Sequence, residues 1–170
     1  MKRTFLIASL AFVFSAHLGA RTLESTVDPL NKGTINVQKG EKTFLKHVDR
    51  SLVLMEQAAD KLGIKGVAVM IFIPGEETVS GVSKMKVVGS MTRKTVNFLA
   101  VANSKIAEMA DTHLDSGSKV REPLTGETGW RGGLIKKVES GYIMAAFSGG
   151  TEDEDIVVAN AGIENMLKRF

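Results

Sequence analysis

The sequence contains no cysteine among its 170 residues. Disulfide bonds, thiolate metal sites, a cysteine nucleophile and a lipoprotein anchor on cysteine are therefore excluded. The fold must be held together by packing alone, and a chain of this length can bury a sufficient core.

Histidine and the large aromatic residues are also scarce, with three His, one Trp and one Tyr. His17, His47 and His113 form no HxxxH or HExxH spacing, so hydrolytic zinc chemistry is poorly supported. A haem iron, in contrast, needs only one His, Met or Tyr as an axial ligand.

An excess of basic charge is missing once the start of the chain is set aside. The formal net charge is +3, but Lys2 and Arg3 lie in a segment that we expect to be removed. The rest of the chain carries the other 20 of the 22 basic side chains and all 19 acidic ones, and its basic residues are scattered along the sequence. We therefore expect no nucleic-acid partner.

The first twenty residues have the layout of an export signal. Residues 1–4 are basic, Phe5–Phe14 is an apolar run, and Leu18–Ala20 offers small residues for cleavage. The run is too short to span a membrane, and no second long apolar run follows. We predict a signal peptide at 1–20, a periplasmic or secreted protein in a bacterium, and no membrane partner after cleavage; an uncleaved N-terminal anchor is the alternative.

The remaining chain divides into a flexible N-terminal arm at 21–42 and one domain at 43–170. Apolar residues at spacings of three and four predict helices, and short β-branched runs predict strands. The predicted helices are Lys42–Leu62, Arg93–Asp111 and one that begins after Thr151, and the predicted strands are Gly66–Ile73, Thr78–Gly89, Leu134–Val138 and Tyr142–Phe147.

This order, α-β-β-α-β-β-α, predicts an α+β fold with an antiparallel sheet of about five strands flanked by helices. Thr151 and Glu154 have the spacing of a capping box, and the acidic run at 152–155 favours a helix start. We interpret that run as capping rather than as a metal site.

A glycine-rich loop at 116–133 is a candidate for a ligand contact. It lacks the Gly-Lys-Ser/Thr ending of a phosphate-binding P-loop. Its glycines could still bring backbone N–H groups close to a ligand. Trp130 could stack on a flat ligand and Arg131 could pair with a carboxylate, although Trp130 could equally be a partly buried core residue.

The final third of the chain resembles the GlcG/HbpS-like family, which includes the C-terminal domain of PduO-type proteins. The resemblance rests on Trp130–Ile135, on Gly141–Thr151 with its Ser-Gly-Gly-Thr ending, on Asp155 and on Ala159–Gly162. The end of the first helix at 62–64 and the segment 102–107 with Lys105 are similar to the same family. The sequence departs from the family pattern at 73–75 and at 84–89.

The resemblance implies a profilin-like sandwich at 43–170 that assembles into homo-oligomers and binds haem or a related tetrapyrrole. We expect His47, His113 and Tyr142 as candidate iron ligands, with His47 first, and Trp130 and Arg131 as further contacts. Three functions remain open: an exported haem carrier, buffer or redox-sensing accessory; an enzyme that degrades haem or acts on a small organic substrate; and an oligomeric partner-binding protein without a small ligand.

Overall fold

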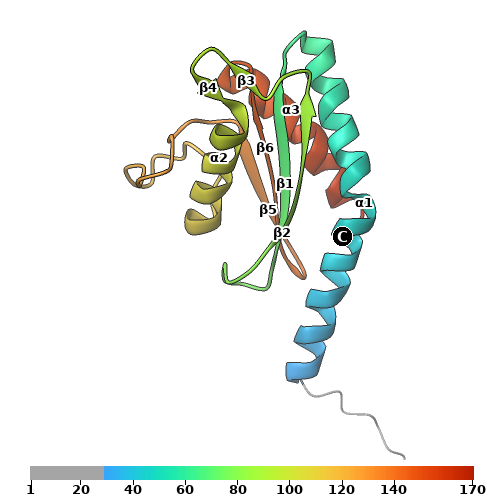
Figure 1. The fold of residues 1–170 in the computed structure, drawn as a ribbon. Coiled ribbons are helices and arrows are strands. Elements are labelled where there is room, and N and C mark those ends of the chain that lie inside the picture. Colours follow the sequence, from blue (N-terminus) through green and yellow to red (C-terminus); the bar gives the residue numbers. More distant parts are fainter. Residues whose placement is uncertain (1–28) are drawn as a thin grey trace, which may run out of the picture.

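The computed structural model describes residues 29–170, and their side chains from residue 36 onward (Figure 1). The predicted signal peptide at 1–20 and residues 21–28 of the predicted arm lie outside the described residues. The elements in chain order are α1 (Pro29–Leu62), β1 (Gly66–Pro74), β2 (Val82–Val88), β3 (Thr92–Arg93), β4 (Val96–Asn97), α2 (Phe98–Thr112), β5 (Gly133–Val138), β6 (Gly141–Ser148) and α3 (Glu152–Leu167).

The main sheet has four antiparallel strands in the order β2-β1-β6-β5. The central strands β1 and β6 are almost wholly buried, as expected of strands that are covered on both faces. β3 and β4 form a separate two-stranded ribbon. The predicted α+β class and the predicted order of the long elements are therefore confirmed, with four strands in the main sheet.

The sheet lies between two helical layers (Figure 1). Alternate residues of β1 and β6 point to opposite faces, because successive strand side chains alternate. Met70 and Ala145 belong to the core beneath α1 and α3, whereas Val69 and Met144 belong to the core beneath α2. Among the helices of the described residues, none is long and apolar enough to cross a membrane.

Helix α1 begins at Pro29, so the prediction that residues 29–42 belong to a loose arm was wrong. The part of α1 at 29–42 carries no clear apolar stripe, and it makes its buried contact through Gly40. A Cβ atom on Gly40 would lie 2.2 Å from Ser140 Oγ and 2.6 Å from Phe72 Cζ. The helix therefore packs directly on the β5–β6 turn through backbone contact, which an apolar periodicity cannot reveal.

Helix α2 begins at Phe98, five residues later than predicted, because the preceding residues form the β3–β4 ribbon. The Asn97 side chain caps it by accepting a hydrogen bond from the Ala100 N–H at 3.1 Å. It ends at Thr112, and His113 follows with a left-handed backbone at φ 55°. The predicted strand at 78–89 likewise begins later, at Val82.

Helix α3 confirms the predicted capping box. The Glu154 N–H donates to Thr151 Oγ1 at 3.4 Å, and the Thr151 N–H donates to Glu154 Oε2 at 2.8 Å. These two bonds satisfy backbone donors that the first helical turn leaves free. The backbone bond from Thr151 also lowers the pKa of the Glu154 carboxyl, because it favours the charged form.

Candidate functional site

The glycine-rich loop between α2 and β5 covers a hollow of about 290 Å³, which we call the loop hollow. One wall is the face of α2 that carries Glu108, and the other is the loop itself. The residues that line it include Glu108, Gly117, Lys119, Arg121, Thr128 and Gly129. Its volume is close to the lower limit for sites that bind small molecules.

Glu108 lines the loop hollow and is only 6 % exposed. Its Oε1 atom accepts a hydrogen bond from the Gly117 N–H at 2.8 Å. Its Oε2 atom is buried and has no hydrogen-bond partner among the described residues. A buried carboxylate oxygen without a donor costs free energy, so this atom can accept a bond from a ligand at a net gain.

A pair of hydroxyl groups adds a second acceptor to the wall. Ser104 lies one helical turn before Glu108, on the same face of α2. Its hydroxyl donates to the Val101 carbonyl at 2.9 Å, and its oxygen lies 3.0 Å from Thr128 Oγ1. Because a hydroxyl has one proton, Thr128 must be the donor of the second bond. The oxygen of Thr128 thus keeps lone pairs for a donor in the hollow.

The loop is fixed by an ionic cluster centred on Arg121. Its guanidinium donates to Asp111 Oδ2 at 2.7 Å and to both carboxylate oxygens of Glu127, at 2.7 and 2.8 Å. Glu127 also accepts a bond from the Leu124 N–H at 2.8 Å. The bonds from Arg121, and then the one from Leu124, lower the pKa of the Glu127 carboxyl to about 2. The positive charge of Arg121 is therefore already matched by two carboxylates.

A buried ion pair anchors the end of the loop. Lys105 Nζ donates to Asp155 Oδ2 at 2.7 Å and to the Phe147 carbonyl at 2.8 Å, and the Gly150 N–H donates to Asp155 Oδ1 at 2.9 Å. Burial lowers the pKa of Lys105 and raises that of Asp155, and each partner opposes the shift of the other. Gly132 packs against this pair, since a Cβ there would lie 2.4 Å from Lys105 Nζ.

Two of the residues predicted as ligand contacts come together on the α2 side of the sheet. The rings of His113 and Tyr142 stack with centroids 4.4 Å apart, and Lys137 Nζ lies 5.8 Å from the Tyr142 ring centre. His113 Nε2 is 3.3 Å from Thr78 Oγ1, whose proton is donated to the Ala110 carbonyl. The imidazole must therefore carry a proton on Nε2 to donate to Thr78.

The other predicted contacts lie elsewhere. Trp130 is 50 % exposed at the end of the loop, so the alternative of a core residue is not what the structure shows. Arg131 pairs with Asp153 at 3.0 Å, and its backbone N–H donates to Glu152 Oε1 at 3.1 Å. His47 lies on α1, on the opposite side of the sheet from His113. His47 and His113 therefore cannot bind one iron within a single chain.

The sequence pattern did not identify Glu108, Arg121 or Glu127. The available signal for Glu108 was its position between Ile106 and Met109, which are both buried. An acidic residue is rarely buried in a helix without a specific partner. The pairing of Arg121 with Asp111 and Glu127 left no signal, because arginine and acidic residues in loops are usually solvated.

No family model matches this chain, and no match was found among curated proteins or solved structures. Within residues 36–170, no group of three or more His, Asp or Glu side chains is placed to hold a metal ion.

Proposed function

We propose that this protein is an exported small-ligand-binding protein and that its ligand is a small molecule with an ammonium group, held in the loop hollow. The observation that carries the proposal is the buried, unpartnered Oε2 atom of Glu108, a residue that lines that hollow. A charged donor such as an ammonium group forms the strongest bond available to a buried carboxylate.

The surroundings of Glu108 support a cation rather than an anion. Both available side-chain atoms identified in the wall, Glu108 Oε2 and Thr128 Oγ1, are acceptors. Arg121 is bonded to Asp111 and Glu127, so it offers little positive charge to a ligand. The four charged side chains that line the hollow are two acidic, Glu108 and Glu122, and two basic, Lys119 and Arg121, so their charges cancel. The two carboxylates that bind Arg121 make the local balance of charge negative, which favours a positively charged ligand.

Ethanolamine is a suitable first probe, because it combines an ammonium group with a hydroxyl in a volume that the hollow accommodates. We expect saturable binding in a titration calorimetry experiment on the purified protein. Glu108→Gln keeps an oxygen for the Gly117 N–H but removes the charge, so it should weaken binding by about tenfold or more. Glu164→Gln, an exposed change on α3, is the matched control and should bind as the original protein does.

Thermal stability separates a ligand site from a merely structural carboxylate. If Glu108 serves binding, Glu108→Gln relieves the cost of a buried charge, and the melting temperature should stay the same or rise. Two results would contradict the proposal: no ethanolamine binding by the original protein, or a Glu108→Gln variant that melts at a lower temperature but binds ethanolamine as before. In the second case Glu108 would stabilise the loop and nothing else.

Haem binding is the second candidate function, and the convergence of His113 and Tyr142 favours it. His113 Nε2 is already engaged with Thr78, and neither ring lines the loop hollow. These residues do not fit a haem within one chain. A haem site would require a second subunit, in line with the homo-oligomer that the resemblance implies.

A further inference from the structure

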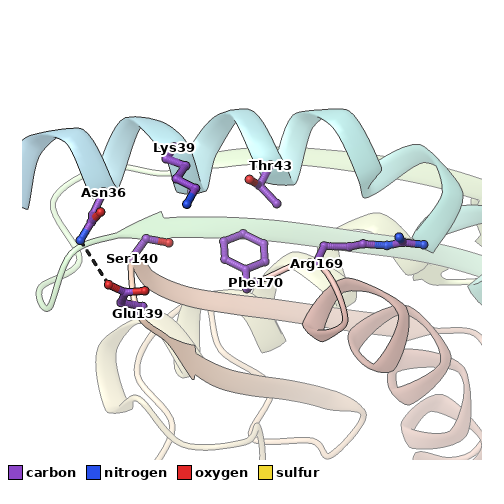
Figure 2. A pocket seen from close by; sticks show the side chains of 8 residues that line it. Asn36, Lys39, Thr43, Glu139, Ser140, Arg169 and Phe170 are labelled. Carbon is purple, nitrogen blue, oxygen red and sulfur yellow. Dashed lines mark hydrogen bonds between the residues drawn. The ribbon is translucent and has the colours of Figure 1, made fainter.

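A second hollow lies on the other side of the sheet, where α1 passes over the β5–β6 turn (Figure 2). We call it the hairpin hollow. It has a volume of about 100 Å³ and is lined by residues that include Lys39, Gly40, Thr43, Ser140, Arg169 and Phe170. That volume equals about three water molecules in the liquid, each of which occupies about 30 Å³. A group of a few heavy atoms fits there.

Ser140 supplies the first indication of a ligand. Its side chain is 8 % exposed, and its Oγ atom is buried without a hydrogen-bond partner among the described residues. Figure 2 shows this hydroxyl directed from the turn toward the space between Lys39 and Phe170. Gly40 allows α1 to approach the turn this closely, because a Cβ on this residue would lie 2.2 Å from Ser140 Oγ.

The charge of the hairpin hollow supplies the second indication. Lys39 from α1 and Arg169 from the end of the chain both line it, and neither forms an ion pair within residues 36–170. Glu139 is the single acidic side chain among the lining residues, and it accepts a bond from Asn36 at 3.4 Å. Lys39 also lines an adjoining hollow together with Lys42 and Lys46.

The field of these cations is felt by a neighbouring side chain. Partial burial lowers the pKa of His47, and the positive charges of Arg169 and Lys46 lower it further. The ring of Phe170, which lines the hollow, packs against that of the buried Phe72 with the ring centres 5.6 Å apart, so one side of the hollow is apolar.

We propose that the hairpin hollow binds a small oxyanion, either a free inorganic anion or the carboxylate end of a small molecule. Arg169 and Lys39 supply the positive charge, and the hydroxyl groups of Ser140 and Thr43 act as hydrogen-bond donors. In Figure 2 the guanidinium group of Arg169 lies on the far side of Phe170 from Ser140, so Lys39 is the cation beside the hydroxyl and Arg169 adds positive charge at the other end of the hollow. This site is separate from the loop hollow and does not depend on the function proposed for it.

The test is a titration of the isotopically labelled protein with phosphate, sulfate and acetate, followed by amide chemical shifts. We expect saturable shifts for at least one of the three anions, confined to residues 36–43, 139–141 and 169–170. Arg169→Gln and Lys39→Gln should each raise the dissociation constant several-fold, and the double variant by about tenfold or more. Lys136→Gln removes an exposed charge from β5 and should leave the dissociation constant unchanged.

Ser140→Ala removes the unpartnered hydroxyl without filling the hollow, so it should weaken binding while leaving the fold intact. Gly40→Ala would fill the hollow but could also displace α1, so Ser140→Ala is the decisive variant. Four results would overturn the proposal: no saturable shift with any of the three anions, shifts spread over the whole surface, shifts that are the same in the double variant, or a dissociation constant that Ser140→Ala leaves unchanged. Each of these would indicate at most general attraction to surface lysines.

Discussion

Lys105 Nζ lies 2.7 Å from Asp155 Oδ2, and the two residues are only 1 % and 4 % exposed. The pair joins α2 to the start of α3 across the end of the glycine-rich loop. Each partner has a further bond, to the Phe147 carbonyl and from the Gly150 N–H respectively. A buried pair with these additional bonds fixes one arrangement of the two helices and the loop.

Removing one member of this pair should destabilise the protein strongly. We expect Asp155→Leu to lower the free energy of unfolding by about 3–5 kcal/mol, because it leaves a buried lysine charge without its partner. The double variant Lys105→Met with Asp155→Leu should recover a large part of that loss. Denaturant unfolding of the single and double variants measures both values. A double variant that is as unstable as the sum of the singles would show that the two residues act independently.

Gly132 should tolerate no side chain. A Cβ there would lie 2.4 Å from Lys105 Nζ and 2.6 Å from Asp155 Cβ, and its φ is +117°. Gly126 also has a positive φ, of +98°, but a Cβ on it meets nothing within 4 Å. We therefore expect Gly132→Ala to lower the melting temperature markedly and Gly126→Ala to show only backbone strain, of about 1–2 kcal/mol. Equal effects of the two changes would argue that the close approach at Gly132 is unimportant.

Acid should release the Arg121 cluster. The pKa of Glu127 is about 2 in the folded protein, chiefly because of its bonds to Arg121, against an ordinary value of 4.5. A group with a lowered folded pKa stabilises the protein above its unfolded pKa, and this stabilisation is lost as the pH falls through its folded pKa. The difference in melting temperature between the original protein and Glu127→Gln should therefore shrink between pH 4.5 and 2. Glu77→Gln, an exposed control, should show no such trend, and a constant difference for Glu127→Gln would contradict the assignment.

A hemin titration decides between the two candidate functions. Because His113 is engaged with Thr78, we expect no saturable Soret shift at one haem per subunit. His113→Ala and the control His47→Ala should then behave alike. A saturable shift that His113→Ala abolishes and His47→Ala preserves would instead establish haem binding at the stacked pair of His113 and Tyr142.

The sequence predicted the fold more completely than the site. The apolar stripe from Phe44 to Ala59 and the continuous apolar run of β1 are local signals, because each follows from the periodicity of one element. Thr151 and Glu154 act within one helical turn, so their capping box could also be predicted. The start of α1 could not, since its buried contact is between Gly40 and a turn one hundred residues later.

The sequence by itself determined the absence of disulfides, the α+β class, the order of the long elements and the glycine-rich loop. The tertiary structure alone decided which polar groups meet. Lys105 and Asp155 are 50 residues apart, and Glu108 becomes a candidate ligand contact only because the loop encloses it. Hydrogen bonding and burial depend on distances in space, and a pattern along the chain does not contain those distances for residues on different elements.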